Sequence, residues 1–334
     1  MATPELNGDG LSQIILALEA TYDPRSNNET RQAALQFLEA AKKQPDAPQH
    51  GFSLANDHGQ PPAVRHFGLS LLEHALRFRW QDYSQEQADT VRGWIIQLAR
   101  DIDEPDPLYY RNKVALLWIE VAKRSWAAEW TDMDEMLVAL WDVTDAKQSV
   151  YRQLVLYILE ILSEDICIRE DAVAVFRQEA LGLALNDIMI PQGIYQGQLD
   201  ARGGKQHSVR FSQEGWLAKV ATLVAACCAS LSQGDPRAAT LAIKGLEALK
   251  PTTVWISLRC LLDANIIDAL YAVMATGNVA AQMVTTRLYN IINMELRRYR
   301  RQLKFSNLFS SALIIRTSRT RGARLCDSHC SVTE

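Results

Sequence analysis

Histidine, cysteine and acidic side chains are the groups in this chain that could bind a metal ion or transfer protons. His66 and His74 lie eight residues apart on an expected helix, with no carboxylate spaced to complete a metal site. Cys326, His329 and Cys330 lack the second Cys/His pair that a zinc site requires. A buried or capping role explains the two histidines better than ligation does, and chance placement explains the second group, so the sequence predicts no metal site.

Two loops resemble functional motifs only in part. Residues 202–205 (RGGK) have no glycine five positions before Gly204 and no Ser or Thr after Lys205, as a phosphate-binding loop would need. The acids of residues 101–106 bracket prolines without the spacing of a calcium loop. With no nucleophile, base or phosphate loop in place, we expect no enzymatic activity and no cofactor.

The composition is that of a folded chain with unevenly distributed charge. Of 334 residues, 48% are hydrophobic and 22% are charged. Nine basic residues and no acid lie between residues 296 and 324, and residues 1–295 carry 26 basic against 37 acidic residues. The net charge of −11 over residues 1–295 predicts attraction to basic partners. We expect no signal peptide and no membrane span, and the six cysteines without framework spacing predict reduced thiols of an intracellular protein.

Apolar residues recur at helical spacing along most of the chain, and no segment has the alternation of a strand. We expect long connections at residues 44–59 and 191–212, the first containing a short helix near Phe52–Asp57. The spacing of helix pairs predicts an all-α, right-handed α-solenoid of HEAT-like helix pairs, and a mixed α/α globule is the alternative. The expected helices, besides the short one, are Leu11–Thr21, Glu29–Lys43, Pro62–Trp80, Ser84–Ile102, Pro107–Trp126, Asp132–Asp142, Lys147–Ile168, Arg169–Asp187, Glu214–Leu231, Pro236–Leu249, Val254–Asp263, Ile266–Ala275 and Ala280–Arg301.

Four segments carry a resemblance to a known family. They are RHFGLSLLEHALRFRW (65–80), KRSWAAEWTDMDEML (123–137), RQAALQFLEAAKK (31–43) and TVWISL (253–258). The first resembles the importin-β N-terminal motif, and the second resembles a turn bracketed by two tryptophans in the exportin-5 family. The chain thus resembles the N-terminal part of a fungal exportin-5-type karyopherin-β. Family members are about three times longer, so the chain looks truncated.

The resemblance implies a nuclear export receptor that shuttles between nucleus and cytoplasm. Implied partners are Ran-GTP, nucleoporins and a protein cargo, with a phosphorylated protein and RNA as the alternative cargo classes; no membrane is involved. A generic helical-repeat scaffold without Ran dependence is the alternative. The implied divisions are an importin-β N-terminal-like region with the first repeats (1–145), further HEAT-like repeats (146–303) and an irregular basic tail (304–334).

Family members bind Ran through the second helices of their first repeats. Here those helices would be Glu29–Lys43, Ser84–Ile102, Asp132–Asp142 and Arg169–Asp187. Their polar candidates for binding Ran are Gln36, Glu39, Arg92, Gln97, Asp132, Glu135 and Asp142. The candidates for contacting nucleic acid are Arg297, Arg298, Arg300 and Arg301.

The last expected helix carries apolar residues that would face a following repeat. These are Val284, Leu288, Ile291, Ile292 and Leu296. We expect them to form an exposed stripe that favours self-association.

Overall fold

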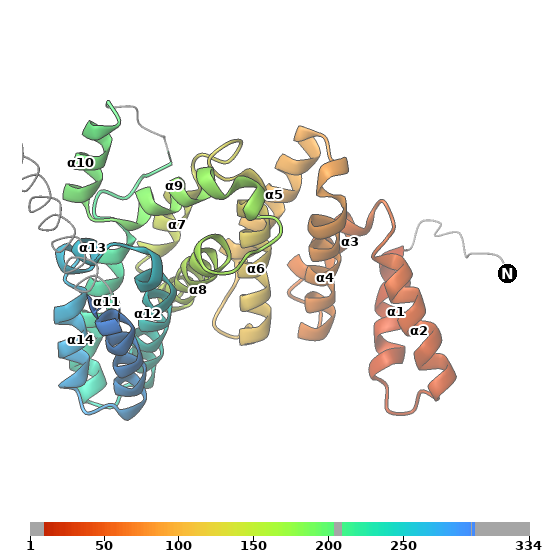
Figure 1. Cartoon of the computed structure of the whole chain (residues 1–334). Coiled ribbons are helices and arrows are strands. Elements are labelled where there is room, and N and C mark those ends of the chain that lie inside the picture. Colours follow the sequence, from red (N-terminus) through yellow and green to blue (C-terminus); the bar gives the residue numbers. More distant parts are fainter. Residues whose placement is uncertain (1–9, 204–208, 295, 298–334) are drawn as a thin grey trace, which may run out of the picture.

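Helices form every regular element in the computed structural model of the chain, which describes residues 10–203, 209–294 and 296–297. Figure 1 shows them following one another from α1 and α2 at one end to α11–α14 at the other. A further helix begins at residue 279 and is continuous to residue 294. The bounds are α1 Gly10–Tyr22, α2 Asn28–Ala41, α3 Ala47–Asn56, α4 Pro62–Arg79, η1 Trp80–Asp82, α5 Gln85–Asp101, α6 Leu108–Ser125, α7 Met133–Trp141, α8 Gln148–Cys167, η2 Val175–Arg177, α9 Gln178–Met189, α10 Gln192–Ala201, α11 Trp216–Ser232, α12 Pro236–Trp255, α13 Leu258–Asp263 and α14 Ile266–Met274.

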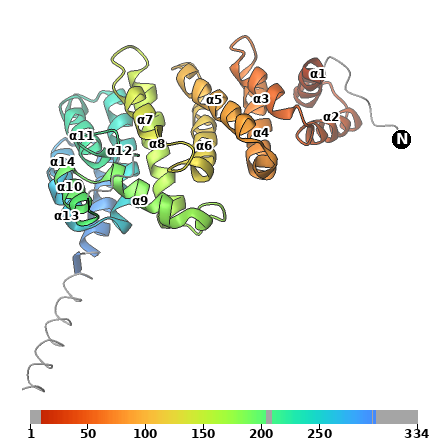
Figure 2. The ribbon, with the colours of Figure 1, turned by 90° about the horizontal axis from the view of Figure 1, so that it is seen from above.

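The helices pack in antiparallel pairs that stack side by side. The pairs of consecutive helices that contact each other are α1/α2, α3/α4, α5/α6, α7/α8 and α11/α12. Figure 2 shows α3, α5 and α7 in one row, and α4, α6 and α8 in the other. Within the second row α4 contacts α6, α6 contacts α8 and α8 contacts α12. Stacking of neighbouring pairs is the arrangement of a helical-repeat solenoid, and it confirms the predicted all-α class.

Local sequence signals explain where several helices begin. Asn27 caps α2 by accepting a hydrogen bond from the backbone N–H of Thr30 (2.7 Å). Ser84 and Gln87 form the predicted capping box at α5, each side chain bonding the other's backbone N–H. Pro62 is the first residue of α4, where a missing N–H has no helical partner to lose.

One buried hydrophobic cluster runs from Ala55 to Ile292, and a smaller one joins α1, α2, α3 and α4. The larger cluster is continuous because apolar residues of each pair pack against those of the next. Tyr110 illustrates this: it is buried on α6 and its hydroxyl donates to the carbonyl of Ala55 on α3 (2.9 Å). No single pair could bury its own apolar face, so the stack stabilises all of them.

The closest helix contact depends on two glycines that face each other. A Cβ built on Gly68 of α4 would lie 2.6 Å from the carbonyl oxygen of Gly51 on α3. A Cβ on Gly51 would lie 2.8 Å from the carbonyl oxygen of Gly68. The missing side chains let the α3 and α4 backbones approach more closely than any other residue would permit.

The pairing of helices differs from the expected one because α3 is longer than the sequence suggested. It begins at Ala47, with Pro48 in its first turn, rather than near Phe52. With α3 as a full partner of α4, the helix α5 pairs with α6 and begins the next repeat. The helices α5 and α7, expected as second helices, are therefore the first helices of their pairs.

Three other boundaries were predicted incorrectly. Residues 169–187 do not form one helix, because Asp171 accepts hydrogen bonds from the backbone N–H groups of Val173 and Ala174 and holds a turn there. The expected loop 191–212 contains α10. The helix α12 continues through Pro251, where packing buries the proline and the Thr252 hydroxyl donates to the carbonyl of Ala248 (3.1 Å).

The predicted exposed stripe on the last helix is partly wrong. Leu288 and Ile292 are 1% and 2% exposed and belong to the main hydrophobic cluster. These two side chains pack into the main cluster and leave water. Its exposed apolar side chains are instead Val279, Met283, Tyr289 and Met294.

Candidate protein-interaction surface

The exposed faces of α5 and α7 carry most of the residues expected to contact a partner. Arg92 on α5 forms an ion pair with Asp89 (2.8 Å) and reaches the carbonyl of Glu129 before α7 (3.5 Å). Gln97 is exposed one turn further along α5. These contacts connect α5 with the turn that leads into α7, so the two helices present one polar surface.

The turn between α6 and α7 is held by two buried tryptophans. Trp126 and Trp130 are 0% and 1% exposed and form a short backbone bridge. Trp118 packs against Trp130 with ring centroids 5.0 Å apart. Arg177 closes the turn by donating to the carbonyl of Trp126 (2.5 Å). Such burial favours a structural role for this pair over a binding platform.

A buried carboxylate fixes α7 to a distant segment of the chain. Asp134 accepts hydrogen bonds from the backbone N–H groups of Phe211 (2.6 Å) and Ser212 (3.0 Å) and from the indole N–H of Trp216 (2.6 Å). Burial raises the pKa of Asp134, although these donors oppose the rise. Trp141 at the other end of α7 packs on Trp216 with centroids 5.4 Å apart. The exposed face of α7 is thus held by contacts on its buried side.

A network of ion pairs connects α6 with α8. Both helices belong to the row opposite α5 and α7 (Figure 2). Lys123, which is 1% exposed, donates to Glu120 (3.1 Å), Asp165 (3.0 Å) and Asp171 (3.1 Å). Burial acts to lower the pKa of Lys123, but the carboxylates of Glu120 and Asp165 outweigh it and raise that pKa overall. Lys123 and Arg124 hold the pKa of Glu120 below its ordinary value despite burial.

The network extends to α4 through a second acidic residue. Glu73 pairs with Lys113 of α6 and with Arg77 one turn away (3.2 Å). Arg77 also reaches Glu120 (3.7 Å), so the charges of α4, α6 and α8 form a continuous chain. Sequence analysis missed these residues, although a lysine next to the apolar stripe of α6 was a readable signal. We call this set of ion pairs the charge ladder.

The predicted Ran-binding residues fall on two different parts of the molecule. Asp132 and Glu135 are exposed at the start of α7, and exposed Asp142 at its end faces Lys219 of α11 (3.6 Å). Gln36 and Glu39 are exposed on α2. The C-terminal end of α2 lies beside α4, since Lys42 sits over the ring of Phe67 (6.0 Å). Of the α5 candidates, Arg92 reaches the turn before α7, whereas the α2 candidates lie on a separate helix pair.

The predicted basic cluster lies mostly beyond the described residues. Arg297 is described and exposed, whereas Arg298, Arg300 and Arg301 lie outside the described part of the chain. The cysteine and histidine residues 326–330 also lie outside it.

Other kinds of site were sought in the described part of the chain. Among residues 10–203, 209–294 and 296–297, no group of three or more His, Cys, Asp or Glu side chains is placed to hold a metal ion. None of the helices described is both long and apolar enough to cross a membrane. The four cysteines that the structure describes, Cys167, Cys227, Cys228 and Cys260, are free thiols.

The chain is similar to known nuclear transport proteins. The importin-beta N-terminal domain matches residues 34–101, which extend from α2 to the end of α5. The chain is 27% identical to Protein MSN5 of Saccharomyces cerevisiae over 301 residues, covering 86% of this chain. The chain is similar to the N-terminal portion of exportin-5-like karyopherins. It is also 30% identical over 160 residues to Exportin-5 of Homo sapiens and 26% identical over 156 residues to Exportin-5 of Dictyostelium discoideum.

This exportin-like chain is short beside its relatives. It spans 24% of the length of Protein MSN5, and the matches to the human and Dictyostelium exportins cover 46% and 47% of this chain and 13% of each relative. The match to Protein MSN5 extends over most of the described solenoid, whereas the importin-beta N-terminal domain is confined to its first repeats.

Proposed function

We propose that this chain is the N-terminal module of a nuclear export receptor that binds Ran in its GTP form. The observation that carries the proposal is the similarity to exportins across a solenoid whose early repeats match the importin-beta N-terminal domain. As a receptor it would act by binding, without an enzymatic step, and would shuttle between nucleus and cytoplasm. Nucleoporins and a protein cargo are the further partners that such a role requires.

The proposal gives the acidic surface of the early repeats a role in binding Ran. Glu135 on α7 and the flanking Asp132 and Asp142 present exposed carboxylates, and Arg92 of α5 reaches the turn before α7. Exposed carboxylates on a rigid helix attract a basic partner and speed its association. Gln36 and Glu39 on α2 offer a second, separate contact.

Capture of purified chain by immobilised Ran tests the proposal. Ran carrying a non-hydrolysable GTP analogue should retain the chain, and Ran-GDP should retain much less. Equal capture of both forms would instead support a helical-repeat scaffold without Ran dependence. Absence of capture by a sample shown to be folded by circular dichroism would contradict the proposal for this chain.

Charge reversal then locates the contact. Glu39→Lys changes α2 and Glu135→Lys changes α7, and both side chains are exposed, so neither change disturbs the core. Loss of capture with one variant assigns Ran to that face, and loss with both assigns it to both. Full capture with both variants would remove these residues from the proposed site.

Anionic cargo is a second proposed ligand class, supported by the basic residues that follow residue 296. Arg297 is exposed at the end of the described solenoid, and Arg298, Arg300 and Arg301 follow it in sequence. RNA or a phosphorylated protein would meet this charge. Binding of a hairpin RNA that weakens steeply with added salt would support RNA as the ligand; weak and salt-independent binding would exclude it.

A further inference from the structure

An open groove lies where the start of α3, the end of α4 and the first half of α5 meet. It has a volume of about 370 Å³, which is enough for several side chains of a bound segment. Residues of all three helices line it, so the groove belongs to the junction of two neighbouring pairs. None of its lining residues is a proposed Ran contact.

Aromatic and proline side chains form much of the lining. Trp94 of α5 stacks on Phe52 of α3, with ring centroids 5.2 Å apart and planes within 9° of parallel. Tyr83, Pro45 and Pro48 line the same groove. Grooves lined by aromatic rings are typical receptors for proline-rich segments, because flat rings pack well against the rings of an extended polyproline helix.

Polar groups in the groove are partly unused. Arg79 donates to the carbonyl of Gln44 (2.8 Å), and its guanidinium lies 6.0 Å from the centre of the Tyr83 ring. The Tyr83 hydroxyl is buried and has no hydrogen-bond partner among the described residues. Gln87 accepts the backbone N–H of Ser84 through its Oε1 (2.9 Å), which leaves its amide NH2 as a donor. Both donors match the backbone carbonyls of a polyproline helix, which have no internal hydrogen bonds.

Two exposed carboxylates, those of Asp82 and Glu86, also line the groove. Arg92, the next arginine along α5, pairs with Asp89 instead (2.8 Å). The guanidinium of Arg79 is occupied by its hydrogen bond to a carbonyl. The groove therefore favours a ligand that brings a further cation, and an arginine can pair with a carboxylate while it stacks on an aromatic ring.

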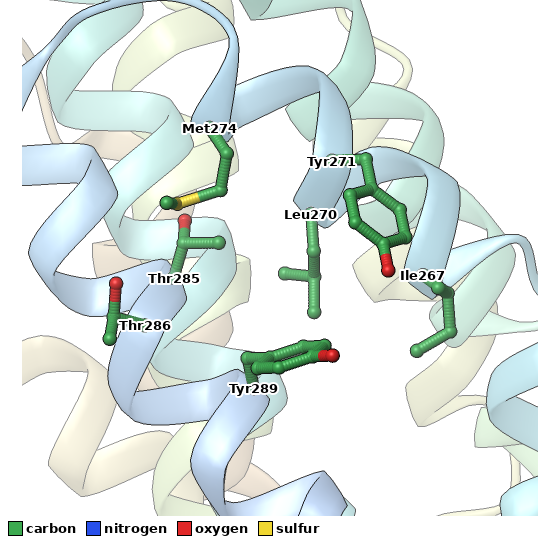
Figure 3. A pocket seen from close by; sticks show the side chains of 7 residues that line it. All are labelled: Ile267, Leu270, Tyr271, Met274, Thr285, Thr286 and Tyr289. Atoms are coloured by element: carbon green, nitrogen blue, oxygen red, sulfur yellow. The ribbon is translucent and has the colours of Figure 1, made fainter.

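A second groove, at the other end of the described helices, lacks this selectivity. Figure 3 shows it between α14 and helix 279–294, and its volume is about 320 Å³. None of the seven residues that line it is charged. The hydroxyls of Thr285 and Thr286 donate to carbonyls of their own helix, both at 2.8 Å. Its lining therefore does not specify the chemistry of a partner, whereas the lining of the groove between α3 and α5 does.

We propose that the groove between α3 and α5 binds an extended, proline-rich segment of a partner protein that carries an arginine. The prolines pack against Trp94 and Tyr83, and the arginine pairs with Asp82 and Glu86. Because such a segment is already extended before it binds, little conformational entropy is lost on binding. The proposal does not depend on Ran, since the two sets of residues differ.

Fluorescence polarisation with the full chain and a synthetic peptide tests the proposal. The probe is a fluorescein-labelled peptide of sequence PPPRPPP. It should bind more tightly, by about fivefold or more, than PPPEPPP, in which the charge is reversed. It should also bind more tightly than GSGRGSG, which keeps the arginine but loses the rings and the stiffness of proline.

Charge reversal at the groove locates the contact. The double variant Asp82→Lys with Glu86→Lys should weaken binding of PPPRPPP by about tenfold or more, because two attractions become repulsions. The matched control is Glu170→Lys with Glu179→Lys. These two exposed acids lie before and within the first turn of α9, much as the first two lie around the start of α5. The control changes the net charge equally and should leave binding unchanged.

Three results would overturn the proposal. The first is absence of PPPRPPP binding by a wild-type sample shown to be folded by circular dichroism. The second is an equal loss of binding in the two double variants, which would reflect the overall charge rather than the groove. The third is equal binding of PPPRPPP and GSGRGSG, which would remove any role of proline.

Discussion

At the scale of single residues, the most unusual side chain is a lysine with almost no contact with water. Lys123 would be strongly destabilising there if it stood alone, since a buried ammonium loses its hydration. Three carboxylates replace that hydration, and they come from α6, α8 and the turn that follows α8. The lysine consequently holds three segments together through one charged group.

Substitution of this lysine measures what the charge ladder contributes. Lys123→Met should lower the free energy of unfolding by about 3–5 kcal/mol, because Glu120 and Asp165 keep their charges in a buried site after losing the ammonium that they share. Lys42→Met is the matched control, since Lys42 also pairs with a glutamate three residues earlier, but that glutamate is exposed. The control should cost less than about 1 kcal/mol. Similar losses in urea titrations of both variants would contradict this account.

Glu160 gives the molecule a predicted dependence on pH. Burial, opposed by Lys244, raises its pKa from 4.5 to about 7. Since the folded state then holds a proton that the unfolded chain releases, stability should fall as pH rises from about 4.5 to about 7. Glu160→Gln should remove this fall and stabilise the protein by about 1–3 kcal/mol at pH 8, with allowance for partial exposure. Thermal melts at pH 5 and pH 8 measure it, with exposed Glu135→Gln as control; equal pH slopes in wild type and Glu160→Gln would disprove it.

The sequence revealed exposed candidates more readily than buried ones. Asp132 and Glu135 could be selected because they are acidic residues at the start of an expected helix. Asp134, between them, is the residue with a defined structural task, yet its partners lie more than 75 positions away. Hydrogen bonds between residues so far apart in sequence do not affect the local spacing of residue types. The sequence therefore could not indicate which of the neighbouring acids is buried.

At the scale of elements, the α3/α4 pair depends on its backbones being in contact. Gly51 and Gly68 both lack the side chain that would separate the helices. Glycine inside a helix has an intrinsic penalty relative to alanine. Here the close packing of Leu69, Leu72 and Leu76 along α4 compensates for it.

Replacing two helical glycines with alanine separates the benefit of close backbone packing from the intrinsic penalty of glycine in a helix. Gly68→Ala should destabilise the protein by about 1–3 kcal/mol, because its Cβ would meet backbone atoms of α3 that cannot move aside. Gly93→Ala on α5 has nothing within 4 Å of its Cβ and should stabilise by up to about 1 kcal/mol. Thermal unfolding of both variants is the measurement. A stabilised Gly68→Ala would show that α3 and α4 are free to separate.

Periodicity identified most helices correctly, and its failures have particular causes. Prolines and glycines around Pro48 and Gly51 concealed α3, although proline in a first turn is compatible with a helix. Pro251 suggested a helix end, but tertiary packing against α8 carries α12 beyond it. Asp171 ended a helix that the apolar spacing alone would have continued. The continuation of α12 depends on a contact between segments that no single window of sequence contains, whereas the other two failures arise from local signals.

At the scale of the whole molecule, each repeat depends mainly on its two neighbours. The contacts between helices connect adjacent pairs from α1/α2 to the last pair. In such a linear array, stability is close to a sum of repeat and interface terms, and damage spreads over a short range. Opening of one end therefore does not require opening of the other.

Two substitutions at opposite ends should consequently have separate effects on hydrogen exchange. Gly215 has a φ of 81°, and a Cβ there would lie 2.1 Å from the carbonyl oxygen of Ile190. Gly215→Ala should accelerate exchange in α9, α11 and α12 and leave α3 and α4 unchanged. Gly68→Ala should produce the reverse pattern. Acceleration throughout the chain in both variants would indicate a single cooperative unit.

The placement of the tryptophans determines what spectroscopy can detect in this protein. Of eight tryptophans, six lie between Trp80 and Trp141, and none precedes Trp80. Trp118, Trp126 and Trp130 are fully buried, and their indole N–H groups donate no hydrogen bond to any described residue. Intrinsic fluorescence will therefore report chiefly on the central repeats. Melting of α1 and α2 will reduce the helical circular dichroism signal while the emission maximum stays constant.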